Sequence, residues 1–246
     1  MVAGAKTLTS DVVNVSVWRG GEDGRFVLYA IPLRQYQTVL DAVTYIQRHL
    51  DPTLSYRFAC RVGMCGSCSM MVNGIPRWTC RTHVHRVLRD NAIELAPLRN
   101  LPVIKDLAVD MTSFFEKWRQ AKGYFQPQAH PPSEFRRVKP DSAQRRAVDK
   151  AIECINCGVC YAACDVVRWN RAYLGPAALN RAWALMNDVR DTAHAERLRA
   201  TSGEAGCHAC HTQQSCYEYC PKHLNPTESI AGLKRMSLWT ALRGGL

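Results

Sequence analysis

Two short runs of closely spaced cysteines constrain this chain more than any other feature of its sequence. The first run reads Cys154-Ile-Asn-Cys157-Gly-Val-Cys160-Tyr-Ala-Ala-Cys164, and the second has cysteines at Cys210, Cys216 and Cys220, followed by a proline. Both runs follow the bacterial ferredoxin spacing, in which three thiolates hold one cubane and the fourth ligates the neighbouring cluster. The sequence therefore predicts a region folded around two adjacent iron-sulfur clusters.

The second run lacks the middle cysteine of that spacing. Gln213 occupies the position. A glutamine amide is a poor ligand for soft iron compared with a thiolate. One cluster then has no protein thiolate at one corner, which indicates a 3Fe-4S cluster beside a 4Fe-4S cluster.

A third cysteine pattern lies nearer the N-terminus. Cys60, Cys65 and Cys68, with Cys80 further on, have the plant-type spacing that holds a 2Fe-2S cluster. A zinc site could be built from the same thiolates. Zinc sites favour paired Cys-x-x-Cys units, however, so this spacing favours the cluster.

The 12 cysteines also bear on the class of protein. A short secreted chain with so many would be a disulfide scaffold, but this chain has 246 residues and no signal peptide is expected. We therefore attribute the cysteines to metal ligation.

No apolar run approaches the roughly 20 residues that span a bilayer, so any membrane contact is expected to be peripheral.

The formal net charge of +11 does not indicate nucleic-acid binding. Three thiolate-bound clusters would remove roughly two charges each and leave about +5. No basic run alternates with stacking aromatic residues, as it would in a single-strand binder. We expect no nucleic-acid partner.

The N-terminal part of the chain begins with two strands and a helix. Residues 12–18 and 26–31 alternate apolar and polar side chains around a glycine-rich turn, a pattern typical of a β-hairpin. Apolar positions then recur at helical spacing over residues 39–50, and Thr38 can cap this helix. This order is typical of the β-grasp fold of plant-type ferredoxins.

Further strand signals complete that domain. Asn73-Gly74, the strongest short hairpin signal, separates predicted strands at residues 69–72 and 75–80, and residues 92–95 predict one more strand.

The rest of the chain is predicted to be helical. Asp110 can cap a helix that runs to about Lys122, and prolines mark residues 123–139 as a linker. No strand signal appears after Asp141, and Asn225-Pro226-Thr227 opens a last helix through Trp239.

These patterns predict an α+β protein with three parts. Residues 1–108 form a β-grasp 2Fe-2S domain, residues 109–140 form a connecting helix and linker, and residues 141–246 form an α-helical ferredoxin domain with two clusters.

The whole series resembles the iron-sulfur subunit of succinate dehydrogenase and quinol:fumarate reductase, the succinate:quinone oxidoreductase family. Beyond the cysteine spacing, the resemblance includes the following runs in order: Cys65-Gly-Ser-Cys68-Ser-Met-Met-Val-Asn, Asp110-Met-Thr-Ser-Phe, Cys154-Ile-Asn-Cys157-Gly, Gly175-Pro-Ala-Ala, Asp188-Val-Arg-Asp191 and Cys220-Pro-Lys-His. Such a series in order is very improbable by chance.

The resemblance implies an electron relay in respiratory complex II of the tricarboxylic acid cycle. Partner subunits would be a flavoprotein with FAD and membrane anchors beside a quinone, and the chain would lie peripherally on the cytoplasmic face of the bacterial cell membrane. Alternatives are a fumarate reductase subunit running in the reverse direction and a stand-alone multi-cluster ferredoxin-like carrier.

The resemblance also implies ligand sets for the three clusters. The implied ligands are Cys60, Cys65, Cys68 and Cys80 for the 2Fe-2S cluster, Cys154, Cys157, Cys160 and Cys220 for the 4Fe-4S cluster, and Cys164, Cys210 and Cys216 for the 3Fe-4S cluster.

Two further residues match the quinone site of the family. Trp169 could orient a quinone carbonyl and His211 could relay protons. Read without the family, Trp169 could be a buried aromatic residue and His211 a donor to a cluster sulfide. The sequence departs from the family at Asp165, where proline is usual. It also has a twelfth cysteine, Cys207, which could be an inert buried thiol or an alternative ligand; we favour the inert thiol.

Overall fold

The structure is a computed structural model that describes residues 12–129 and 137–245. The chain divides into two compact units. Unit 1 ends at Val109 apart from a short excursion, residues 99–101, that belongs to unit 2, and unit 2 continues from Asp110. From Asp110 on, the described part of the predicted connecting segment therefore belongs to unit 2.

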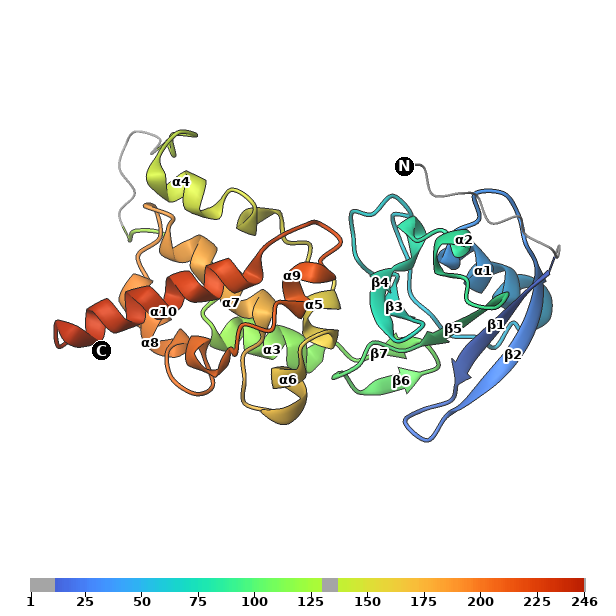
Figure 1. Ribbon diagram of the computed structural model, residues 1–246. Coiled ribbons are helices and arrows are strands. Elements are labelled where there is room, and N and C mark those ends of the chain that lie inside the picture. Colours follow the sequence, from blue (N-terminus) through green and yellow to red (C-terminus); the bar gives the residue numbers. More distant parts are fainter. Residues whose placement is uncertain (1–11, 130–136, 246) are drawn as a thin grey trace. The chain divides into compact units, whose positions relative to one another are not determined.

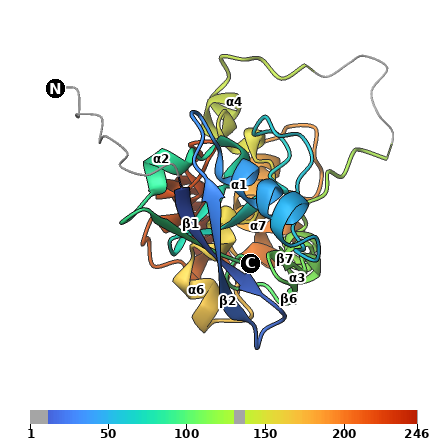
Figure 2. The ribbon, with the colours of Figure 1, turned by 90° about the vertical axis from the view of Figure 1, so that its right-hand side faces the viewer.

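Unit 1 is built on a five-stranded sheet (Figure 1, Figure 2). Its strands are β1 (Val12–Arg19), β2 (Arg25–Pro32), β3 (Ser69–Val72), β4 (Ile75–Trp78) and β5 (Ala92–Ala96). They lie in the order β2-β1-β5-β3-β4, with β1 and β5 parallel and the other pairs antiparallel. This mixed sheet confirms the predicted β-grasp domain.

The predicted helix packs on that sheet. Helix α1 (Val39–Tyr45) begins with a capping box between Thr38 and Asp41, and it continues as one π-helical turn, η1 (Ile46–Leu50). Its apolar face joins the inward side chains of β1 and β5 in one buried core. The alternation of Val13, Val15 and Val17 along β1 explains that burial, since alternate residues face one side of a sheet.

Some elements of unit 1 were not predicted or end elsewhere. The strand predicted over residues 75–80 ends at Trp78, because the chain turns there into the 3-10 helix η2 (Thr79–Arg81). The structure also has the short helix α2 (Val84–Val87) and a small sheet of β6 (Val103–Lys105) and β7 (Ala108–Val109). Runs of two to four residues are too short to carry a periodic signal.

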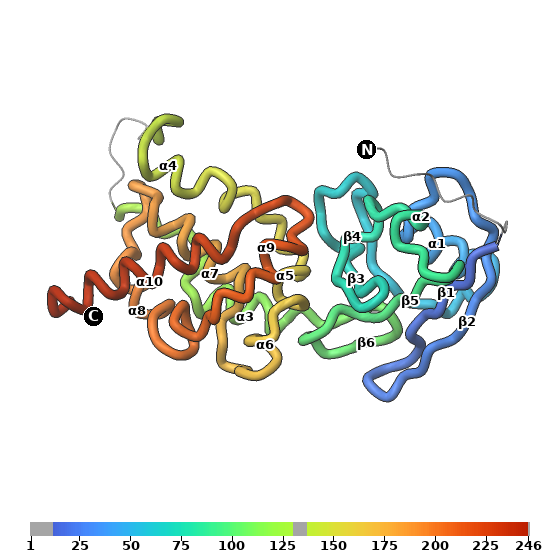
Figure 3. Tube along the Cα trace, in the orientation of Figure 1, coloured from blue at the N-terminus to red at the C-terminus, as the bar shows by residue number. Residues whose placement is uncertain are grey.

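The described residues of unit 2 contain helices and no strand (Figure 3). The helices are α3 (Thr112–Gln120), α4 (Ala143–Val148), η3 (Ala151–Glu153), α5 (Val159–Ala162), α6 (Asp165–Trp169), α7 (Pro176–Met186), α8 (His194–Thr201), η4 (Cys207–Ala209), α9 (Ser215–Glu218) and α10 (Pro226–Leu242). Helix α7 is largely buried and contacts α3, α8 and α10, so it forms the centre of this unit.

The ends of two helices test the predicted caps. The last helix begins where Asn225-Pro226-Thr227 predicted it, with the Asn225 side chain accepting a hydrogen bond from the Glu228 backbone, and it runs beyond the predicted Trp239 to Leu242. Asp110 does not cap α3: Met111 is the N-cap, and the Asp110 carboxylate instead accepts from the amide and hydroxyl of Thr112.

Within the described ranges, no helix combines the length and apolarity needed to cross a bilayer.

Candidate iron-sulfur sites

The first site lies in unit 1, where the loop 60–68 approaches η2. The amides of Met64 and Cys65 donate to Cys60 Sγ at 3.2 and 3.3 Å, and the amide of Cys80 donates to Cys68 Sγ at 3.4 Å. The structure thus places Cys60 beside Cys65 and Cys68 beside Cys80. Backbone N–H groups directed at sulfur favour the thiolate form that iron requires.

A glycine lets this loop fold closely. Gly63 has a positive φ of 75°, and a Cβ there would lie 3.0 Å from the Trp78 ring. The loop therefore needs a residue that lacks Cβ, both for the backbone conformation and for the contact with Trp78.

The thiols of this site differ in acidity. Hydrogen bonds from the Cys60 backbone and then from the Ser67 side chain lower the pKa of Cys65 to about 6, against the effect of burial. Burial, and then the neighbouring Cys68 thiol, raise the pKa of Cys80 to about 12. A bound cationic iron centre would deprotonate such a thiol. Four thiols with directed amides fit a 2Fe-2S cluster.

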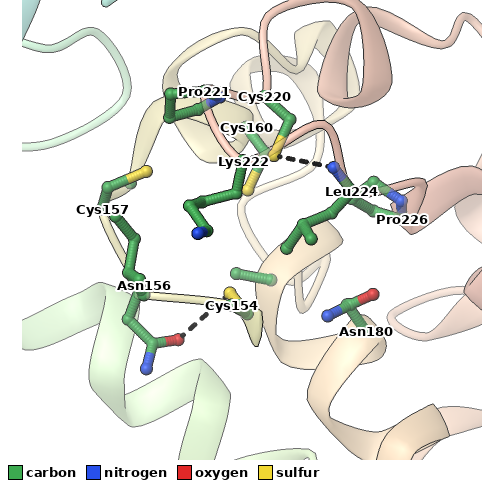
Figure 4. A pocket seen from close by; sticks show the side chains of 13 residues that line it. Cys154, Asn156, Cys157, Cys160, Asn180, Cys220, Pro221, Lys222, Leu224 and Pro226 are labelled. Carbon is green, nitrogen blue, oxygen red and sulfur yellow. Dashed lines mark hydrogen bonds between the residues drawn. The ribbon is translucent and has the colours of Figure 1, made fainter. Parts of the chain in front are cut away.

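The second site is a hollow in unit 2 (Figure 4). Cys154, Cys157, Cys160 and Cys220 line it together, although the last is 60 positions beyond the third in sequence. The Leu224 amide donates to Cys220 Sγ at 3.4 Å. Apart from Lys222, the other lining residues are uncharged: Ile155, Asn156, Gly158, Ala177, Asn180, Pro221, Leu224 and Pro226.

Burial makes three thiols of this second site less acidic. It raises the pKa of Cys157 to about 12, and it raises the pKa values of Cys154 and Cys160 as well. Buried thiols in apolar surroundings are inert unless a positive charge stabilises the thiolate. A donor set of four half-buried thiols that line one hollow fits a 4Fe-4S cluster, which would supply that charge.

The third site is a neighbouring hollow lined by Cys164, Cys210 and Cys216. The Thr212 amide lies 3.4 Å from Cys210 Sγ, and Cys216 Sγ lies 3.4 Å from the Thr227 hydroxyl. Burial raises the pKa of Cys216 to about 11. The hollow thus offers three thiols, a donor set that suits a three-iron cluster.

Gln213 and His211 also line this third hollow, whereas Cys207 is not among its lining residues. Cys207 is fully buried in η4, and burial raises its pKa to about 11. Its placement supports the interpretation as a buried thiol.

The two predicted quinone residues, His211 and Trp169, lie at different places in unit 2. His211 is exposed at the third hollow, and Trp169 is at the end of α6 with 69% of its surface exposed. This exposure excludes a buried aromatic role for Trp169 within the chain. The structure does not include Trp169 in the lining of the hollow that holds His211.

Sequence reasoning missed two residues at the second hollow. Asn180 comes from α7, and its side chain donates to the Ala151 carbonyl and accepts from the Ser229 hydroxyl. Lys222 follows Cys220-Pro221 directly, and this adjacency is the signal that could have found it.

Comparison with known families finds two cluster-binding regions in the chain. Residues 14–116 match the family described as 2Fe-2S iron-sulfur cluster binding domain, and residues 153–225 match the family described as 4Fe-4S dicluster domain. The fold and the sites therefore define a two-domain iron-sulfur protein.

Relatives narrow this class. The fumarate reductase iron-sulfur subunit of Haemophilus influenzae is 37% identical over 90% of this chain and 91% of its own length, and the succinate dehydrogenase iron-sulfur subunit of Paracoccus denitrificans is 36% identical over 88% and 83%. A chain of the Mycobacterium smegmatis Sdh1 complex in the apo form superposes with a TM-score of 0.83 at 30% identity, covering 92% of this chain and 95% of that one. The chain belongs to the family of electron-transfer iron-sulfur subunits of succinate dehydrogenase and fumarate reductase.

Proposed function

We propose that this chain carries electrons from a flavoprotein subunit with FAD to a quinone held beside membrane anchor subunits, as a succinate:quinone oxidoreductase. One observation supports this proposal above the others. The chain has three separate groups of thiols, and the last group has three members instead of four. Each bound iron-sulfur cluster would accept and donate one electron at a time. Clusters held in series can therefore transfer single electrons along the chain.

The ligand sets follow from the groups that the fold brings together. Cys60, Cys65, Cys68 and Cys80 would hold a 2Fe-2S cluster, Cys154, Cys157, Cys160 and Cys220 a 4Fe-4S cluster, and Cys164, Cys210 and Cys216 a 3Fe-4S cluster. The amides of Met64, Cys65, Cys80, Thr212 and Leu224 donate to sulfur and stabilise its negative charge.

Trp169 and His211 would serve the quinone. The Trp169 indole N–H can donate to a quinone carbonyl oxygen, and its exposure leaves it free to meet a ligand or partner. An imidazole nitrogen of His211, at the hollow of the last three thiols, can hold one of the two protons that reduction of a quinone to a quinol consumes.

The direction of the reaction is a separate part of the proposal. We assign succinate oxidation, in which electrons run from the flavoprotein to the quinone, and the identity of 36% with the Paracoccus denitrificans succinate dehydrogenase subunit supports it. Fumarate reduction is the second candidate, favoured by the identity of 37% with the Haemophilus influenzae fumarate reductase subunit. Succinate-driven quinone reduction and quinol-driven fumarate reduction, measured on one purified complex, decide between them.

The proposed location is the cytoplasmic face of the bacterial cell membrane, with the chain bound peripherally to its anchors. Helix α10 supports the peripheral contact with the anchors, since Leu238, Trp239 and Leu242 are 58%, 62% and 71% exposed near its end. An apolar patch of this kind marks an interaction surface.

The test of the proposal is co-purification from gentle detergent extracts. An affinity-tagged chain should bring with it a flavin-bearing subunit and anchor subunits, and electron paramagnetic resonance should show three distinct centres. A tagged chain that emerges with its clusters but without a flavoprotein would instead support the stand-alone carrier.

A further inference from the structure

A lysine and a glutamate meet at the hollow formed by Cys154, Cys157, Cys160 and Cys220. Figure 4 shows the Lys222 side chain extending from the Cys220 loop toward the hollow, of which it is a lining residue. Its Nζ lies 3.6 Å from Oε2 of Glu153. The pair therefore joins the segment after the last cysteine of the site to the residue before the first.

Lys222 is distinct among the 13 residues that line this hollow. It has the only lysine, arginine, aspartate or glutamate side chain in the lining, where the remaining polar side chains are the amides of Asn156 and Asn180 and the thiols. The lining of the neighbouring hollow of Cys164, Cys210 and Cys216 contains no residue of these four charged types. The two linings thus differ by one positive charge, and the nearby cation Lys234 instead donates to the Cys210 carbonyl outside the lining of the third hollow.

The two members of the pair are unequally exposed. The Lys222 side chain is 26% exposed and the Glu153 side chain 61%. Solvent screens the more exposed charge more strongly, so the ammonium should act on the hollow more than the carboxylate does. Arg181 is a second cation whose field reaches Cys154, but its Nε donates to the Gly123 carbonyl and it is not a lining residue.

We infer that Lys222 raises the reduction potential of the cluster held in this hollow and that Glu153 limits the rise. The inference rests on the ligand set of the proposed function. Reduction adds one electron and leaves the thiolates in place, so the reduced form carries one more negative charge than the oxidised form. A nearby ammonium stabilises the more negative form more, and the potential rises. Lys222 therefore acts on the cluster through its electric field and touches no substrate.

The test is a redox titration of the 4Fe-4S signal by electron paramagnetic resonance in the intact membrane complex. Lys222→Met should lower the ratio of reduced to oxidised centre at a fixed ambient potential by roughly three- to tenfold. Tenfold corresponds to about 59 mV for a one-electron couple. Glu153→Gln should change the ratio in the opposite direction by a smaller factor, because it removes the opposing charge.

Two controls keep charge and fold separate. Lys222→Arg retains the cation and should keep the potential of the unaltered protein. Lys139→Met removes an exposed lysine that is not in the lining and should leave the potential unchanged. If Lys222→Met fails to retain its cluster, Glu153→Gln decides: an upward shift supports the inference and an unchanged midpoint overturns it.

The outcomes also separate this inference from the proposed function. A 4Fe-4S signal whose midpoint is the same in Lys222→Met, Glu153→Gln and the unaltered protein overturns the inference and leaves the ligand set standing. Shifts of the same sign in both variants overturn it as well. Absence of any 4Fe-4S signal from the unaltered complex overturns the ligand set and the inference together.

Discussion

Arg197 and Asp191 form an ion pair in which both side chains are fully buried in unit 2. The two guanidinium nitrogens donate to the two carboxylate oxygens at 2.7 and 3.0 Å. Arg197 also donates to the carbonyls of Lys122 and Tyr124, and Asp191 accepts from the amide of Gln126. The pair therefore ties the segment that follows α3 to the start of α8.

Breaking this pair should destabilise unit 2. We expect Asp191→Asn to lower the free energy of unfolding by about 3–5 kcal/mol, because it leaves the buried Arg197 charge without its counterion. Urea unfolding followed by circular dichroism measures the loss. The exposed pair of Arg190 and Asp188 is the matched control, and Arg190→Ala should cost less than about 1 kcal/mol. Equal losses in the two variants would contradict the assignment.

The same pair makes stability depend on pH in acid. Burial alone would raise the pKa of Asp191, but hydrogen bonds from Arg197 and from the Gln126 and Ala193 amides outweigh it, so this pKa lies below its ordinary value. The stabilisation is therefore complete above the unfolded pKa of about 4 and is lost as the pH falls through the lower folded value. Urea midpoints measured from pH 6 downward should fall less steeply for Asp191→Asn than for the unaltered protein.

Gln213→Cys should convert the third site to four thiolates. We expect the nearly isotropic electron paramagnetic resonance signal of an oxidised 3Fe-4S centre in the unaltered protein and its loss in the variant, with a lower potential and slower quinone reduction. Gln213→Ser adds no thiolate and should retain the signal. A signal that is absent from the unaltered protein and appears only in Cys207→Ser would make Cys207 a ligand and defeat the assignment.

Substitution of the proposed quinone residues should separate two assays. His211→Ala and Trp169→Leu should each reduce quinone turnover about tenfold, the effect of losing one hydrogen bond of about 1.4 kcal/mol. Succinate oxidation by a dye that accepts electrons upstream should stay within twofold, roughly, of the unaltered rate. Phe115→Leu alters another exposed aromatic residue and is the control. Parallel losses in both assays would mean that the two side chains are structural.

The end of α10 should hold the chain at its anchors. Replacing Leu238, Trp239 and Leu242 by glutamine removes the exposed apolar patch, and we expect the flavoprotein and this chain to appear together in the supernatant after membranes are pelleted. Leu28→Gln changes an exposed leucine of unit 1 and should leave them in the pellet. Membrane association that survives the triple substitution would place the anchor contact elsewhere.

The sequence by itself determined the kind of cofactor and much of the local structure. Cysteine spacing is read within one loop, so the patterns around Cys60 and Cys154 indicated clusters before any packing was known. Short-range signals likewise predicted the β1–β2 hairpin, the Thr38 cap and the start of the last helix at Asn225-Pro226, because each depends on residues a few positions apart.

Only the tertiary structure decided which distant residues share a site or a contact. It placed Asn180 and Lys222 in the lining of the hollow of Cys154 and left Trp169 exposed. It also paired Lys222 with Glu153 and buried Arg197 against Asp191. Burial and charge pairing depend on how separate helices pack, and no local period or spacing in the sequence encodes that packing.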